Sequence, residues 1–207
     1  MKETKRYIGR QNRQKATQTR ADILNEAYNL FSSNGFEGTS LRMIANHSGV
    51  THATITHHFG CKKQVYLAAI QECANQYCST IQTIANKHSN QPNKAYSFSG
   101  LVSELLQTTI KYAGLFRLLG AVRCEDFEEY ACITAKIDTA HEELLPLFAD
   151  LKSRSPHLSR LSFNSFILLL IGTVSVPIIM KESHNESPSA QQLENKDRGS
   201  ILEALLF

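Results

Sequence analysis

The chain of 207 residues has few of the residues that build turns and sheets. Glycine occurs 10 times and proline 5 times. Segments in which apolar and polar residues alternate are scarce, which argues against half-buried β-strands. With 42% hydrophobic and 20% charged residues, the composition is that of an ordinary globular protein. We therefore expect an all-α fold.

The sequence also lacks the patterns that identify the common classes of enzyme. It has no glycine-rich phosphate loop, no nucleophile elbow, no cluster with metal-ligand spacing and no obvious acid–base pair. From these absences we expect neither catalysis nor a bound cofactor or metal ion.

Cysteine is rare as well, and its pattern suggests no disulfide framework. The five residues are odd in number and lack the paired spacing of metal sites; they are Cys61, Cys73, Cys78, Cys124 and Cys132. No secretory signal is recognisable at the start of the sequence. We expect free thiols in a reducing cytoplasm, with a redox-sensing cysteine as the alternative.

One long apolar run raises the question of a membrane span. Residues 161–180 contain no charged side chain and approach the ~20 apolar residues that cross a bilayer. Several polar residues interrupt the run, and Arg160 and Lys181 flank it on both sides. We favour a buried helix that pairs with a second copy in a four-helix bundle. The expected interface consists of Phe163, Phe166, Ile167, Leu170 and Val174.

Charge is distributed unevenly along the chain. Residues 1–63 hold ten basic and four acidic residues, a net of +6, whereas the remainder holds twelve basic and fifteen acidic residues, a net of −3. This asymmetry indicates a polyanionic partner for the first part only. Residues 1–17 are basic with almost no apolar anchors, and we expect a flexible arm. The arm is either a solvated tail or a segment that follows DNA phosphates or enters a minor groove.

Residues 39–59 predict two short helices joined by a tight turn. Thr39 or Ser40 caps the first helix, whose apolar residues recur at helical spacing. Gly49 stands at the turn, where a left-handed backbone angle is required. Thr51 caps the second helix, and Ile55 faces inward with Phe59. This pattern is typical of a helix-turn-helix, whose second helix enters a DNA groove.

The outward face of the second helix carries small side chains that form hydrogen bonds and suit base edges and phosphates. These residues are His52, Ala53, Thr54, Thr56 and His57. Histidines at 47, 52, 57 and 58 raise the alternative of a metal site. The spacing of His52 and His57, five residues apart, disfavours it.

The rest of the chain predicts further helices. One runs over residues 19–34, and a long one from Lys62 to about Lys87 would connect two bodies. Later helices are expected over 97–119, 127–151 and 158–181, with loops at 88–93 and 184–199 and a short apolar helix at 201–207. We therefore divide the chain into residues 1–17, a helix-turn-helix domain over 18–63 and a helical domain over 64–207.

Residues 19–70 resemble the tetracycline-repressor (TetR) family of bacterial transcription regulators. The resemblance rests on residues 22–31, 35–40, 44–45, 48–50 and 58–59 and on Lys62-Lys63, and it covers about a quarter of the chain. It implies a three-helix DNA-binding domain and a helical domain that forms a homodimer around a small-molecule pocket. Such a repressor leaves a palindromic operator when its ligand binds. An activator, a regulator without a ligand and a membrane-tethered DNA-binding protein are the alternatives.

The resemblance also implies roles for single residues. Thr39 would contact a phosphate, and Thr51, His52, Ala53 and Thr54 would begin the recognition helix. Lys62, with Lys63 beside it, would contact a phosphate from the start of the long helix. Two lysines at a helix N-terminus oppose the macrodipole, and a phosphate would relieve that conflict. The sequence departs from the family pattern at Thr56, where Tyr is common, and at Cys61, where Ser, Asp or Thr is common.

Polar residues within apolar helices are the only indication of a ligand pocket. The candidates are Arg117, Arg123, His141 and Asn164. Two of them have structural alternatives, since Arg123 could form a surface ion pair with Glu125 or Asp126, and Asn164 could form a hydrogen bond across the dimer.

Overall fold

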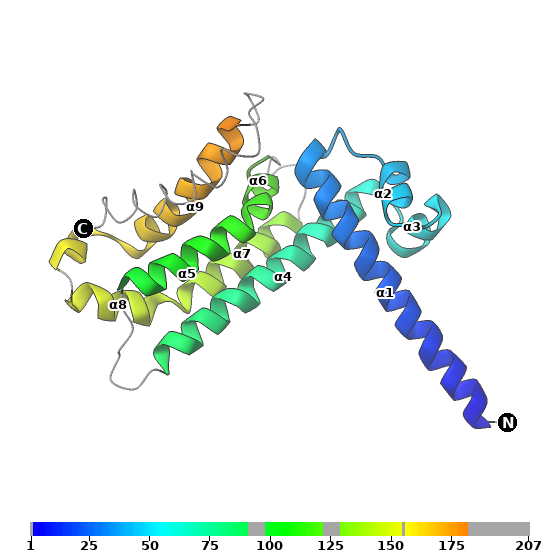
Figure 1. The fold of residues 1–207 in the computed structure, drawn as a ribbon, viewed down its shortest axis with the longest axis horizontal. Coiled ribbons are helices and arrows are strands. Elements are labelled where there is room, and N and C mark those ends of the chain that lie inside the picture. The colour runs from blue at the N-terminus through cyan, green and yellow to red at the C-terminus, as the bar shows by residue number, and fades with distance from the viewer. Residues whose placement is uncertain (1, 91–97, 122–128, 155, 182–207) are drawn as a thin grey trace. The chain divides into compact units, whose positions relative to one another are not determined.

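The computed structural model describes residues 2–90, 98–121, 129–154 and 156–181, and these form helices and the turns between them (Figure 1). No strand occurs within these ranges, so the expected all-α class is confirmed. The chain divides into two compact units, Met1–Cys73 and Ala74–Phe207. This division lies inside a long helix rather than at its start near residue 64.

The first unit contains α1 (Lys2–Asn34), α2 (Leu41–His47), α3 (His52–Phe59) and the first turns of α4 (Lys62–Ser89). Its core joins all four helices through fully or nearly fully buried side chains. These are Ile23, Leu24, Ala27, Phe31, Ile44, Ala45, Ile55, Val65, Tyr66 and Ile70. The predicted helix-turn-helix and the long helix after it are both present.

Helix α1 begins at Lys2, whereas the sequence analysis placed its start at Thr19. The residues predicted as a flexible arm are therefore helical in the structure. Residues 2–18 contain a single glycine, no proline and many Lys, Arg and Gln residues, which favour helix. A helix nucleated by the packed residues 23–34 can extend through such a segment at little cost.

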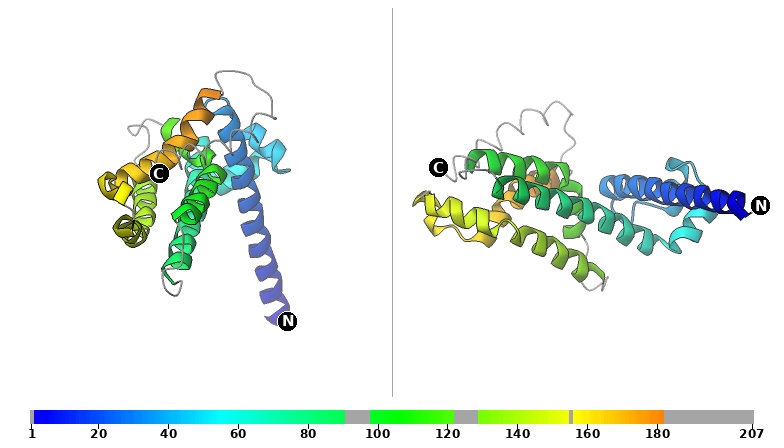
Figure 2. Two further views of the ribbon diagram at one scale, coloured as in Figure 1. Left: turned by 60° about the vertical axis from the view of Figure 1, so that its left-hand side comes forward. Right: turned by 90° about the horizontal axis from the view of Figure 1, so that it is seen from below.

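The second unit contains the rest of α4 together with α5 (Phe98–Lys111), α6 (Ala113–Ala121), α7 (Glu129–Glu142), α8 (Leu145–Arg154) and α9 (Phe163–Lys181). Figures 1 and 2 show α4 beside α5 and α7. Hydrogen bonds join α4 to α7, such as that from the Lys136 ammonium group on α7 to the Asn75 side-chain oxygen on α4 at 2.5 Å.

Each of the three long helices predicted for this unit is interrupted. The segment 97–119 breaks at Tyr112 between α5 and α6, and residues 158–181 begin with a 3-10 turn at Pro156–Arg160. The segment 127–151 breaks before Pro146, which lies in the first turn of α8. Proline has no backbone N–H and fits best in a first turn, which agrees with a new helix that begins just before Pro146. Residues 91–93, 184–199 and 201–207 lie outside the described residues.

The apolar helix α9 packs on α5 and α6 of its own subunit. Phe166 and Leu170 are buried within this subunit, with 2% and 3% of their surfaces exposed, and the Phe166 ring stacks on Phe148 of α8 at 5.2 Å between centroids. The expectation that they face a second copy is therefore wrong. The periodicity predicted an apolar face on this helix but could not show which part of the protein covers that face. Phe163 and Ile167 are half-buried, and Val174 lies beyond the part of α9 whose side chains are described. Among the described residues, no helix combines the length and the apolar character needed to span a bilayer.

Candidate nucleic-acid interface

The turn between α2 and α3 is fixed by local hydrogen bonds. Ser40, not Thr39, caps α2, because its hydroxyl oxygen accepts from the Met43 N–H at 3.2 Å. Gly49 has φ of +64°, and the following N–H of Val50 donates to the Ala45 carbonyl at 3.0 Å. These contacts end α2 and direct the chain into α3 as the sequence predicts.

Helix α3 is anchored on one side and exposed on the other. The Thr51 hydroxyl accepts from the Thr54 N–H at 3.1 Å, which confirms the predicted cap. Ile55 is fully buried, whereas Phe59 is only half-buried. Because the inner face of α3 packs through Ile55, the packing of this residue sets the orientation of the outer face.

The predicted contact residues lie together on that outer face. Thr51, His52, Ala53, Thr56 and His57 are exposed, and Thr54 is half-buried. The Thr56 hydroxyl donates to the His52 carbonyl at 3.1 Å, which holds its short side chain against the helix. The surface thus offers hydroxyl and imidazole groups within two turns of helix, close enough to read neighbouring base pairs.

Thr39, which was predicted to contact a DNA phosphate, does not lie on this exposed face. Its side chain is 1% exposed, and its hydroxyl donates to the Gly35 carbonyl at 2.9 Å and lies 3.1 Å from the Leu30 carbonyl. These bonds hold the link between α1 and α2. In this conformation the hydroxyl is directed into the unit, so it does not face a phosphate.

Lys62 lies at the start of α4 with two partners that the sequence analysis missed. Its Nζ is 3.9 Å from a Glu37 carboxylate oxygen and 4.3 Å from the centre of the Phe36 ring. The Glu37 side chain is 94% exposed, so this ion pair is weak and screened by salt. The aromatic ring positions the ammonium group, and a phosphate can replace the carboxylate. Part of the conflict with the helix dipole is therefore relieved before any anion arrives.

The histidines and cysteines of the described residues do not form a metal site. No group of three His, Cys, Asp or Glu side chains is arranged to hold a metal ion there. Cys61, Cys73, Cys78 and Cys132 are free thiols, and Cys124 lies outside the described part.

In the second unit, two of the four pocket candidates line one groove. His141 and Asn164 border a hollow of about 530 Å³ between α7 and α9, which also exposes Leu145 and Leu168. Its volume lies in the range of small-molecule sites. Arg117 lies on α6 and lines neither this groove nor the smaller cavity beside it. Arg123 is not among the described residues.

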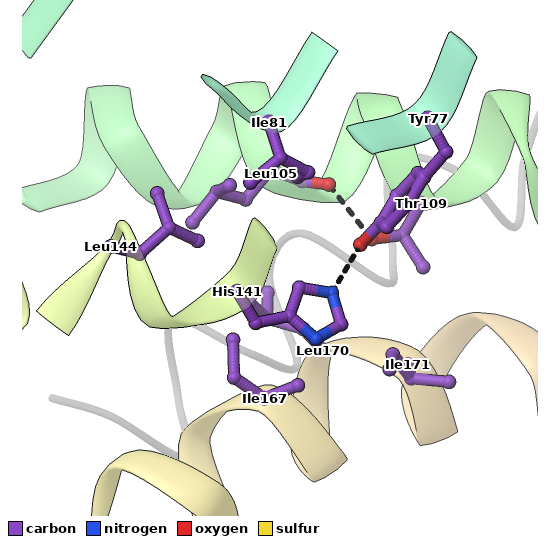
Figure 3. Close-up of a pocket in the computed structure, with 9 residues that line it drawn as sticks. All are labelled: Tyr77, Ile81, Leu105, Thr109, His141, Leu144, Ile167, Leu170 and Ile171. Atoms are coloured by element: carbon purple, nitrogen blue, oxygen red, sulfur yellow. Dashed lines mark hydrogen bonds between the residues drawn. The ribbon is translucent and has the colours of Figure 1, made fainter. Parts of the chain in front are cut away.

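A buried hydrogen bond links α4 to α7 beside the groove. The Tyr77 hydroxyl on α4 and Nε2 of His141 on α7 are 2.7 Å apart, and His141 is 5% exposed (Figure 3). Burial lowers the pKa of His141 to about 4, against the opposing effect of Asp138, and burial raises the pKa of Tyr77. Both groups are therefore neutral near pH 7. The hydrogen bond therefore joins two neutral groups, and the tautomer of the imidazole decides which of them donates.

The match to a family model lies within the first unit. Residues 23–69 match the family model described as bacterial regulatory proteins, tetR family. The transcriptional repressor AcnR of Corynebacterium efficiens is 33% identical over 67 residues, 32% of this chain and 36% of that protein. The negative transcriptional regulator IcaR of the Staphylococcus aureus biofilm operon icaADBC is 30% identical over 76 residues, 37% and 41% of the two chains.

The matched region therefore spans well under half the length of these curated relatives. A solved structure shares the fold more widely. A TerR/AcrR-family transcriptional regulator from Aquifex aeolicus has a TM-score of 0.60 at 15% identity, with 90% of this chain and 99% of that chain covered.

Proposed function

We propose that this chain, whose N-terminal domain belongs to the tetR family of bacterial regulatory proteins, is a dimeric repressor of transcription that binds a palindromic operator. The observation that carries the proposal is the capped helix α3, pinned by Ile55 beneath an exposed face of hydroxyl and imidazole groups. Such a helix presents its first turns to the edges of base pairs in a major groove.

We assign the residues of this unit to two tasks. His52, Ala53, Thr54 and His57 read bases, while Thr51 and Thr56 contact the backbone near them. Lys62 and Lys63, at the start of α4, bind phosphate and set the register of α3 in the groove. Thr39 acts within the fold, through its bonds to the α1–α2 link.

A selection experiment tests the proposal directly. Purified protein is incubated with fragments of the genome from which its gene comes, and the bound fragments are sequenced. We expect recovery of a palindromic site whose half-sites lie about one helical turn apart, or a multiple of it, because a two-fold dimer presents two copies of α3. Recovery of fragments without a shared palindrome would refute the repressor function.

We place the ligand that controls operator binding in the groove bordered by His141 and Asn164. The apolar side chains of the walls favour a ligand with an apolar body, and His141 and Asn164 provide polar groups that can form a hydrogen bond with a ligand oxygen. Asp138 and Glu142 also line the groove, and their carboxylates disfavour an anion. A second copy that rests on the exposed Leu145 and Leu168 would close the groove. These features favour an uncharged, apolar effector with a carbonyl or hydroxyl oxygen.

Mass spectrometry of molecules that co-purify with the protein identifies the effector. The molecule found is then titrated into the complex of protein and operator. We expect His141→Phe to raise the concentration that releases the operator about tenfold, because one hydrogen bond is lost. Tyr112→Phe removes a buried hydroxyl near Thr80, away from the groove, and serves as control. Equal release concentrations for wild type and His141→Phe would place the effector elsewhere.

A further inference from the structure

Arg20 is an exposed basic residue of α1 that lies beside the core of the first unit. It precedes the buried Ile23 and Leu24 by about one turn of helix. An α-helix turns about 100° per residue, so Arg20 shares the face of α1 that carries the buried Ala27 and Phe31. Helix α1 therefore directs this arginine toward the helix-turn-helix on which it packs.

The Arg20 side chain contacts an aromatic ring of α3. The guanidinium carbon lies 5.1 Å from the centre of the Phe59 ring, a distance typical of a cation–π contact. No carboxylate among the described residues forms an ion pair with Arg20. Asp22 follows Arg20 by two residues and Glu26 by six, which places them about 160° and 120° away around α1. The guanidinium N–H groups are therefore available to an anion from outside the chain.

Phe59 lies at the edge of the outer face of α3. Around this helix it is about 40° from the buried Ile55 and about 20° from the exposed His52. Its half-buried ring agrees with that position. Neither α2 nor α3 contains an acidic residue that would repel an anion here. Arg20 thus borders the face that the proposed function assigns to DNA.

We propose that Arg20 binds a DNA phosphate at the rim of the groove that α3 enters, with Phe59 positioning its guanidinium group. The inference rests on the proposed function and adds a contact from α1 to the same partner. The major groove is about 12 Å wide, so the backbones of its two strands flank a helix that lies in it. A cation beside the helix therefore meets a backbone rather than base edges. The planar guanidinium group suits this role because it can donate two parallel hydrogen bonds to one phosphate.

The test compares removal of charge at Arg20 with removal of charge at a similar residue of the second unit. Arg20→Gln removes the cation, and Arg20→Lys keeps it. Lys111→Gln is the matched control, because Lys111 is exposed and its ammonium group lies 5.0 Å from the centre of the Tyr112 ring. The affinity of each full-length variant for the palindromic operator recovered by selection is measured by fluorescence anisotropy at several salt concentrations.

We expect Arg20→Gln to bind the operator about tenfold more weakly at low salt. The slope of log K against log salt should fall by about 1.8, because a dimer loses two phosphate contacts and each contributes about 0.9. Arg20→Lys should keep the slope of wild type, and Lys111→Gln should match wild type in both affinity and slope. An unchanged slope for Arg20→Gln would overturn the inference even if the affinity fell, since an arginine that only supports α3 leaves the salt dependence as it was.

A double-mutant cycle tests the role of the ring. Phe59→Leu keeps an apolar side chain but removes the cation–π contact, and we expect it to weaken operator binding about threefold. In the Arg20→Gln background the same change should have little further effect. Losses that simply add would show that Phe59 does not position Arg20.

Ethylation of single DNA phosphates separates this inference from the proposed function. With wild type, ethylation of a phosphate at the rim of each half-site should weaken binding, and Arg20→Gln should become insensitive to ethylation at that position alone. If ethylation of the same phosphates weakens binding by both proteins, Arg20 contacts none of them, and the inference fails while the repressor stands. A wild-type protein that binds no palindrome refutes the repressor, and this contact with it.

Discussion

Replacing Phe31 with alanine is expected to destabilise the first unit by about 3–5 kcal/mol, the usual cost of removing a buried aromatic ring. Phe31 is completely buried. Its ring packs edge-on against Tyr66 at 4.8 Å and beside Phe36 at 6.0 Å, between centroids. The loss of such aromatic contacts lowers the stability further than the buried area of the ring alone would predict.

The expected effect extends to DNA binding because Phe36 also carries the Lys62 ammonium group on its face. When Phe31 is removed, the ring that positions a proposed phosphate contact loses its support. We therefore expect weaker operator binding even at temperatures where the unit remains folded. Urea unfolding followed by circular dichroism measures the stability, and anisotropy measures the binding.

Asn29→Ala is the matched control for this substitution. Asn29 lies two residues earlier on α1 and is exposed, so the change should alter stability by less than about 0.5 kcal/mol. If Phe31→Ala lowered the free energy of unfolding by no more than the control does, the aromatic cluster would not be the centre of the core of this unit.

The helix-turn-helix could be predicted because its determinants are local. A cap at Thr51, a glycine at position 49 and the inward Ile55 lie within a few residues of one another, and each acts through backbone geometry or helical periodicity. The long helix α4 was predictable for the same reason, since its apolar residues recur at helical spacing over its full length.

The errors concern partners that are distant in sequence. The hydroxyl of Thr39 bonds to a carbonyl nine residues earlier, on α1, which no local pattern reveals. Phe166 and Leu170 form an apolar face in the sequence, but only the packing of α9 on α5 and α6, and of Phe166 on Phe148 of α8, shows that the subunit itself covers this face. The pairing of Tyr77 with His141 spans 64 residues and could not be foreseen, although His141 was a candidate.

Ala53→Glu is expected to abolish operator binding while leaving the fold intact. Ala53 is the second residue of α3 and is exposed, so a longer side chain meets no packed neighbour. A carboxylate in the first turn of a helix is favourable by about 0.3–1 kcal/mol, because it faces the positive end of the dipole. The unfolding midpoint of the first unit should therefore stay constant or rise slightly.

The same carboxylate would stand against phosphates and base edges if α3 enters the groove. Like charges brought together at an interface cost several kcal/mol, and a dimer on a palindrome meets this cost twice. We expect affinity for the selected operator to fall at least about 100-fold, measured by anisotropy at fixed salt.

Ala53→Gln is the control, because glutamine has nearly the same size and no charge. It should bind much closer to wild type than the glutamate variant does. A glutamate variant that is as stable as wild type and binds within threefold of Ala53→Gln would show that the first turn of α3 does not face DNA. Because the substitution is expected to stabilise the helix and block the interface, loss of binding cannot be attributed to loss of the fold.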